Sequence, residues 1–274
     1  MSVIVLASAS GSPGVSTTAV GLALSWPRPV LLLEADPTGG SAVLAGYLRG
    51  LVTPAGSVID LAQALHGGDL LAALAGASMP LPGSTASLVP AVGSHGQARS
   101  LVPLWEPLAA ALRSLEETGQ DVIVDAGRLG LFASPDPLID AADLALLVAR
   151  TDLVSVLRAR SWAHTLAERF ARAGAAGNVG LLTVGPPDPF RPREIATVLA
   201  LPVVASVAWD PASAAVYSRG APPPGASWLE RLTRRDGWAD APLQRSLRAA
   251  HSAITGTIRA TTEHLNPSAV GRPT

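Results

Sequence analysis

The chain has 274 residues, of which 48% are hydrophobic and 15% charged, a composition that supports a substantial buried core and excludes a largely disordered chain. The formal net charge of -1 provides no overall attraction to nucleic acid or to an anionic membrane. Cysteine is absent, which excludes disulfides, thiolate metal sites and thiol nucleophiles.

Apolar segments of the chain are short. The first residues, "MSVIVLA", lack the basic region of a signal peptide. Runs such as "ADLALLVA" fall below the roughly 20 residues of a membrane span. We therefore expect a soluble, cytoplasmic protein without a membrane span, and membrane association is not the favoured interpretation.

Strands and helices alternate along the first 210 residues. The pattern predicts buried strands at residues 2–8, 29–36, 87–92, 120–127, 142–149, 178–185 and 202–209. It predicts helices at residues 16–26, within 57–75, within 101–119, and at 153–174 and 191–200. This alternation indicates a single α/β domain, residues 1–265, with a mostly parallel central sheet flanked by helices. Residues 266–274 are expected to form a flexible tail.

The alternation of strands and helices ends beyond Pro211. A Pro/Gly loop at 219–227 precedes a short helical piece at 228–238 and a final helix at 242–265. Six arginines fall between Arg231 and Arg259, against three neighbouring acids. One face of the final helix is apolar: Leu243, Leu247, Ala250, Ile254, Ile258 and Leu265. Packing on the domain is the favoured interpretation; a membrane-surface helix and non-specific, salt-dependent DNA contact are the alternatives.

The segment "GSPGVSTTA", residues 11–19, lies between the first predicted strand and the first predicted helix. Glycines in such a loop let main-chain N–H groups approach an anion, which the helix dipole also favours. Ser16 or Thr17 stands where a hydroxyl would hold Mg²⁺. The plain alternative is an ordinary turn, capped by Ser16 at the start of the helix.

These segments resemble the ParA/MinD family of SIMIBI-class P-loop ATPases, and most of all its actinobacterial partitioning-like and pilus-locus (CpaE/TadZ-type) members. "GSPGVSTTA" resembles the family's deviant Walker A motif, "GGVGKTTTA". "VLLLEADPTGG" resembles "VLLIDADPQGG", and "DVIVDAG" resembles the Walker B strand. The resemblance covers residues 3 to about 220 and implies a P-loop NTPase fold that binds ATP or ADP with Mg²⁺.

The resemblance also implies roles for particular residues. The nucleotide-binding set would be Gly11, Ser12, Gly14, Val15, Ser16 and Thr17. Ser16 would ligate Mg²⁺ and Thr17 would contact the α-phosphate. Asp125 would hold the water shell of the metal, Asp36 would orient the attacking water, and Glu34 would lie near the metal in support.

The chain departs from the family pattern in its positive charges, because it has no lysine and all 20 basic residues are arginine. Val15 occupies the position of the phosphate-bridging lysine, and Ser10 that of the lysine that reaches across a dimer interface. Thr183 stands where many members place an asparagine against adenine, and Pro13 lacks an N–H.

The missing lysine has a cost that is larger for catalysis than for binding. A charge-assisted hydrogen bond contributes about 1.5–3 kcal/mol, so nucleotide binding should weaken about 10- to 100-fold. A transition-state arginine alone changes phosphoryl-transfer rates by about 10³–10⁵. We therefore expect weak or absent binding of ATP/ADP and Mg²⁺, with very slow or absent hydrolysis. Arg128, three residues beyond Asp125, is a candidate replacement cation; a solvated surface arginine is the alternative.

The predicted function is that of a ParA/MinD-like positioning or scaffolding protein with a degenerate nucleotide site. It would act through a protein partner of a positioning, pilus or partition assembly, as a homodimer, an apo dimer or a monomer. The alternative is an active ATPase of DNA or plasmid partitioning that binds DNA non-specifically. The five histidines show no metal-ligand spacing.

Overall fold

The computed structural model describes residues 1–10, 12–115, 119–186, 189–224 and 237–265. Gly11 of the loop, the predicted tail at 266–274 and nearly all of the helical piece predicted at 228–238 lie outside the described residues.

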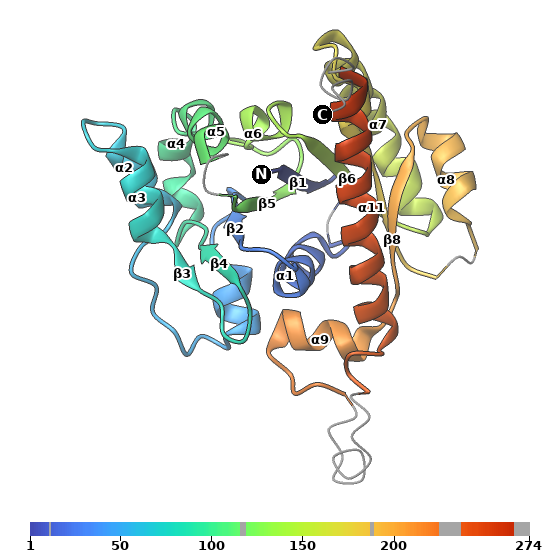
Figure 1. Cartoon of the computed structure of the whole chain (residues 1–274), viewed down its shortest axis with the longest axis horizontal. Coiled ribbons are helices and arrows are strands. Elements are labelled where there is room, and N and C mark those ends of the chain that lie inside the picture. The colour runs from blue at the N-terminus through green and yellow to red at the C-terminus, as the bar shows by residue number, and fades with distance from the viewer. Residues whose placement is uncertain (11, 116–118, 187–188, 225–236, 266–274) are drawn as a thin grey trace, which may run out of the picture.

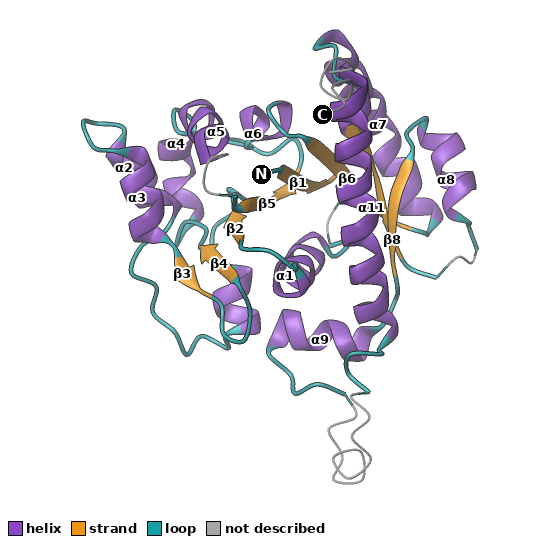
Figure 2. Ribbon diagram, viewed as in Figure 1, coloured by secondary structure: helices purple, strands orange, loops and turns teal. Residues whose placement is uncertain are grey.

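The core of the fold is one eight-stranded sheet with the order β3-β4-β2-β5-β1-β6-β7-β8 (Figure 2). Every pairing is parallel except that of β3 with β4. The strands are β1 (Val3–Ser8), β2 (Val30–Glu34), β3 (Met79–Pro80), β4 (Ala86–Val89), β5 (Asp121–Arg128), β6 (Leu144–Arg150), β7 (Val179–Val184) and β8 (Val203–Val207).

Helices cover both faces of this sheet (Figure 1). They are α1 (Val15–Ser25), α2 (Val58–Ala64), α3 (Leu70–Ala77), α4 (Ala98–Leu101), α5 (Trp105–Ser114), α6 (Asp136–Asp140), α7 (Leu153–Arg172), α8 (Pro192–Leu199), α9 (Pro211–Arg219) and α11 (Pro242–Leu265). The chain also forms three short helical turns, η1 (Val43–Tyr47), η2 (His95–Gln97) and η4 (Ala176–Asn178), among the described residues. The predicted fold class, a mostly parallel sheet flanked by helices, is confirmed.

Several elements were not predicted from the sequence: β3, α4, α6 and α9, together with the short turns η1, η2 and η4. The two-residue strand β3 and the five-residue helix α6 are too short to show a period. Helix α9 begins after Asp210, which accepts hydrogen bonds from Ser213, and has Pro211 in its first turn. An acid before an N-terminal proline is a helix-start signal, so this element could have been found.

Alternate side chains of the central strands enter two separate cores. On β1, Val3, Val5 and Ala7 belong to the cluster that packs with α2, α5, α7 and α8. Ile4 and Leu6 belong to the cluster beneath α1 and α11. Because both faces of the sheet are buried, its strands read as nearly continuous apolar runs.

The final helix, α11, runs beside β8 and α1 (Figure 1). Its apolar face is buried through Leu243, Leu247, Ala250 and Ile254, so packing on the domain is confirmed. Gly21 of α1 allows the close approach, because a Cβ there would lie 2.7 Å from Leu247 Cδ1. Among the described residues, no helix is long and apolar enough to cross a bilayer.

Asp121, at the start of β5, is a fully buried carboxylate that joins three segments. It accepts hydrogen bonds from the Ser2 backbone N–H at 2.9 Å and the Trp26 indole N–H at 2.8 Å. Arg28 forms an ion pair with it at 2.6 Å. These contacts join three segments to the start of β5: the residue before β1, the end of α1, and the residues that lead into β2. They lie at the amino ends of the strands, whereas the loop at residues 10–14 lies at the carboxyl ends.

Replacement of Asp121 by alanine should lower the free energy of unfolding by about 3–5 kcal/mol, because it leaves buried donors without an acceptor. Arg28→Ala should cost less, since the Arg28 side chain is 52% exposed and the other two donors remain. Urea denaturation followed by circular dichroism measures both. Equal losses would show that the ion pair, and not the buried donors, is the source of the stability.

Candidate functional site

The loop between β1 and α1 has an unusual backbone. Ser12 has φ 62° and Gly14 has φ 99°. A non-glycine residue in the left-handed region is strained and persists where the surrounding structure demands it, often at a ligand site. The loop lies at the carboxyl ends of the parallel strands, where open α/β sheets bind ligands.

Helix α1 begins without a side-chain cap. Its N-cap residue, Gly14, makes no capping hydrogen bond, and the first intrahelical bond runs from the Thr18 N–H to the Gly14 carbonyl at 2.9 Å. Ser16 lies inside the helix, so the interpretation of the loop as a turn capped by Ser16 is wrong. The N-termini of four other helices are capped by the side chains of Ser57, Asp69, Asp152 and Asp210. Among the described residues, no side chain accepts from the first N–H groups of α1, and unpaired groups of this kind can bind an anion.

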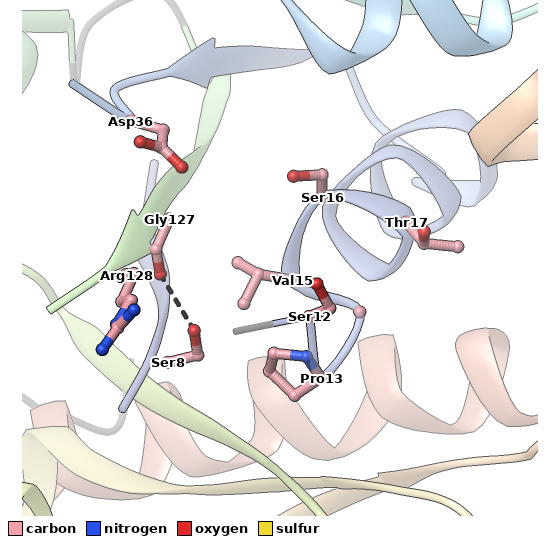
Figure 3. Close-up of a pocket in the computed structure, with 10 residues that line it drawn as sticks. Ser8, Ser12, Pro13, Val15, Ser16, Thr17, Asp36, Gly127 and Arg128 are labelled. Carbon is pink, nitrogen blue, oxygen red and sulfur yellow. Dashed lines mark hydrogen bonds between the residues drawn. The ribbon is translucent and has the colours of Figure 1, made fainter. Parts of the chain in front are cut away.

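A cavity of about 390 Å³ opens at this uncapped end. Figure 3 shows the loop and the start of α1 on one side of it, with Asp36 and the end of β5 on the other. Its walls are Ser8, Ser12, Pro13, Gly14, Val15, Ser16, Thr17, Asp36, Gly127 and Arg128. The structure thus brings the predicted site residues that it describes to one place, with Asp125 buried beneath them.

Val15 occupies the position of the expected lysine, and its side chain packs into the core. It is 6% exposed and belongs to the hydrophobic cluster beneath α1 and α11. The only cation that the described residues contribute to this cavity is Arg128. Arg128 is exposed and forms no ion pair with another described residue.

Two buried carboxyls lie near the cavity on neighbouring strands. Burial, and to a lesser extent the charge of Asp36, raise the pKa of Asp125, while hydrogen bonds from the Ser16 hydroxyl and the Gly127 N–H lower it; the net effect is a pKa raised to about 6. Burial also raises the pKa of Glu34 to about 7. Glu34 accepts hydrogen bonds from the Ser41 hydroxyl and from the Val43 N–H at 3.0 Å.

This group of oxygens suits a magnesium ion only together with a ligand. Ser16 and Asp125 are adjacent oxygen donors of the kind Mg²⁺ takes. Within the described residues, no group of three or more histidine or acidic side chains is placed to hold a metal by itself. The residues therefore fit an ion that completes its shell with water and phosphate oxygens, the usual arrangement for magnesium nucleotides.

Gly127 is a site residue that the sequence reasoning missed. It has φ 61°, and a Cβ there would lie 2.1 Å from Asp36 Oδ2. The other oxygen of Asp36 accepts hydrogen bonds from the Thr38 N–H at 2.8 Å and the Thr38 hydroxyl at 2.7 Å. Asp36 therefore stabilises the turn that follows β2 and also packs closely against the backbone of β5 at Gly127. The glycine two residues after an acid in "DAG" was the available signal.

A second cavity, of about 440 Å³, adjoins the loop on its other side. Val184, Val207 and Trp209 supply apolar wall, and Arg219 from α9 also lines it. The Arg150 guanidinium lies 4.2 Å from the centroid of the Trp209 ring. Trp209 and Arg219 were missed because their places depend on how β8 and α9 pack.

Thr183, the residue at the expected adenine-contact position, does not line this cavity. It is 1% exposed, and its hydroxyl pairs with that of Ser206 at 2.8 Å, across β7 and β8. Thr183 therefore has a structural role in the sheet.

The two raised pKa values predict that stability falls as pH rises. Glu34 keeps its proton up to about pH 7 in the folded chain, against 4.5 as its reference value. Its stabilising contribution is full below pH 4.5 and is lost as pH rises to about 7, a change of about 3 kcal/mol. Glu34→Gln should flatten this part of a urea-denaturation series between pH 4.5 and 7. An unchanged slope in the variant would contradict the assignment.

Comparison with known proteins finds similarity at the level of structure. No protein-family model and no curated protein sequence matches the chain. A ParA family ATPase from Chlorobium tepidum TLS superimposes with a TM-score of 0.68 at 15% identity, over 92% of this chain and 98% of that one. A chain of the MinC:MinD cell division protein complex from Aquifex aeolicus gives 0.66 at 15% identity, over 93% and 96%.

A third solved structure contains a nucleotide. The septum site-determining protein MinD from Pyrococcus horikoshii OT3, complexed with Mg-ADP, gives a TM-score of 0.66 at 16% identity, over 92% of this chain and 95% of that one. At these identities the likeness establishes the fold. The chain has the same fold as these ParA and MinD proteins.

Proposed function

We propose that this chain is a ParA/MinD-like positioning or scaffolding protein with a degenerate nucleotide site. It binds magnesium nucleotides weakly, hydrolyses ATP very slowly or not at all, and acts through protein partners. One observation carries the proposal. The uncapped end of α1 opens into the cavity of about 390 Å³, while the side chain at the lysine position is buried in the core.

The parts of the site differ in what they can do. The N–H groups at the start of α1 and the oxygens of Ser16 and Asp125 are suited to phosphates and their magnesium ion. A bound Mg²⁺ would supply charge to the phosphate oxygens and would favour the ionised form of Asp125. Phosphoryl transfer also needs cations over the transferred group, and Val15 supplies none. Binding is therefore retained better than catalysis.

The solved structures with this fold support action through partners. One of them is a MinC:MinD complex, in which a cell division protein of this fold is assembled with a second protein. We propose by analogy a protein partner of a positioning, pilus or partition assembly, and a homodimer as one state of this chain. Ser10 replaces the lysine expected across the nucleotide-dependent interface, so an apo dimer or a monomer also fits the proposal.

An active partitioning ATPase is the second candidate function. It is supported by Arg128, whose charge lies in the cavity wall without an ion-pair partner among the described residues. The DNA contact that accompanies this candidate has less support. On α11, Arg248 donates to the Ala239 carbonyl at 2.8 Å, and Arg245 donates to the Asp240 carbonyl. Both arginines thus brace the turn that precedes the helix.

Val15→Lys should restore part of the missing charge. We expect the variant to bind MgATP about 10- to 100-fold more tightly than the wild type, the equivalent of one charge-assisted hydrogen bond. Isothermal titration with MgATP and MgADP measures this. Val15→Met is the matched control, because it introduces a long side chain without the charge and should leave the affinity low.

Phosphate release distinguishes the two candidate functions. The proposed function expects little or no phosphate from wild-type protein with MgATP. Rapid turnover by the wild type that is abolished by Ser16→Ala would favour the active ATPase instead. An electrophoretic shift over a salt series, with and without MgATP, tests the accompanying DNA binding.

A further inference from the structure

The second cavity shares part of its wall with the phosphate loop. Ser12, Pro13, Gly14 and Thr17 line both cavities. Helix α9 forms another wall through Pro211, Ala214 and Ser218, which recur at the spacing of one helical face. A ligand with an anionic end at the start of α1 could therefore extend directly into this second space.

Arg219, the last residue of α9, is held at the rim of this cavity by the way the helix ends. Gly220 follows it with φ 61°, and a Cβ at Gly220 would lie 2.8 Å from the Tyr47 carbonyl oxygen. The Ala221 N–H closes the helix end on the Ala215 carbonyl at 3.2 Å. On the buried side of α9, Tyr217 accepts a hydrogen bond from Gln244 of α11. Both ends of the last turn are thereby anchored.

The charge of Arg219 is not neutralised by another described residue. Its side chain forms no hydrogen bond or ion pair within the described part of the chain, and the residue is exposed. Asp210, the acid lining the same cavity, is occupied by Ser213, whose N–H donates at 3.1 Å and whose hydroxyl donates at 2.6 Å. Arg219 thus brings a positive charge with no ion-pair partner among the described residues to a cavity that shares part of its wall with the start of α1.

We propose that Arg219 supplies, from α9, positive charge for the phosphates of a nucleotide bound at the loop. This inference rests on the proposed weak nucleotide binding and identifies its ligand class as a nucleoside diphosphate or triphosphate. The base occupies the apolar part of the second cavity, against Val184, Val207 and Trp209. Arginine differs from the missing lysine in its reach and fork geometry, so it compensates for charge without restoring the lysine's position over the phosphates.

The test compares the affinities of MgADP, MgATP and adenosine for full-length variants, measured by isothermal titration. Arg219→Ala should weaken MgADP and MgATP binding about 10-fold or more, the range for loss of a charge-assisted contact, and leave adenosine binding unchanged. Arg219→Lys should retain most of the affinity. Arg193→Ala, an exposed arginine on α8 that lines neither cavity, is the matched control and should bind like the wild type.

Three outcomes would overturn the inference. MgADP binding equal in Arg219→Ala and wild type would show that Arg219 is a surface arginine without a ligand. An equal loss of adenosine and MgADP would show that it shapes the cavity and does not contact phosphate. Absence of MgADP binding to the wild type would remove the ligand, yet would leave a nucleotide-independent positioning function standing. Thermal melting of each variant confirms that the fold is retained.

Discussion

The packing of α1 across the central strands is the contact on which the rest of the site depends. Gly21 lets α11 approach closely, and Trp26 at the far end of α1 is tied to the buried carboxylate of Asp121. Because α1 is held at its far end and along its length, its N-terminus stays at the carboxyl ends of the strands, and no side chain among the described residues pairs with its first N–H groups. The anion binding that we propose therefore depends on this packing.

The balance of charge beside the loop is the second constraint on the site. Glu34 and Asp125 face one another across β2 and β5, and burial raises the pKa of both. A lysine at position 15 would bring a cation to the same cavity, but Val15 joins the hydrophobic core instead. Under the proposed function, the main-chain donors and carboxylate oxygens favour binding of a magnesium nucleotide, while the fixed cation that catalysis requires is missing at position 15.

Site residues that belong to local motifs could be predicted from the sequence, whereas those that depend on contacts between distant segments could not. Ser12 and Gly14 lie in the loop after β1, Ser16 in the first turn of α1, Asp36 just after β2, and Asp125 in the second half of β5. Local motifs place such residues at the carboxyl ends of the strands of a parallel sheet. Gly127 was missed because its close contact with Asp36, which leaves no room for a Cβ, joins segments that are remote in sequence. Thr183 was associated with the ligand by resemblance, but its hydroxyl forms a hydrogen bond with the Ser206 hydroxyl of the neighbouring strand β8.

The sequence by itself determined the alternation of buried strands and helices, the phosphate-loop pattern and the absence of lysine. These features depend on residue type and local period. Only the tertiary structure decided that α1 has no side-chain cap, that Val15 is buried against the cluster beneath α1 and α11, and that Arg219 of α9 lines the cavity beside the loop. Each of these depends on contacts between segments far apart in the chain, whose geometry no local period encodes.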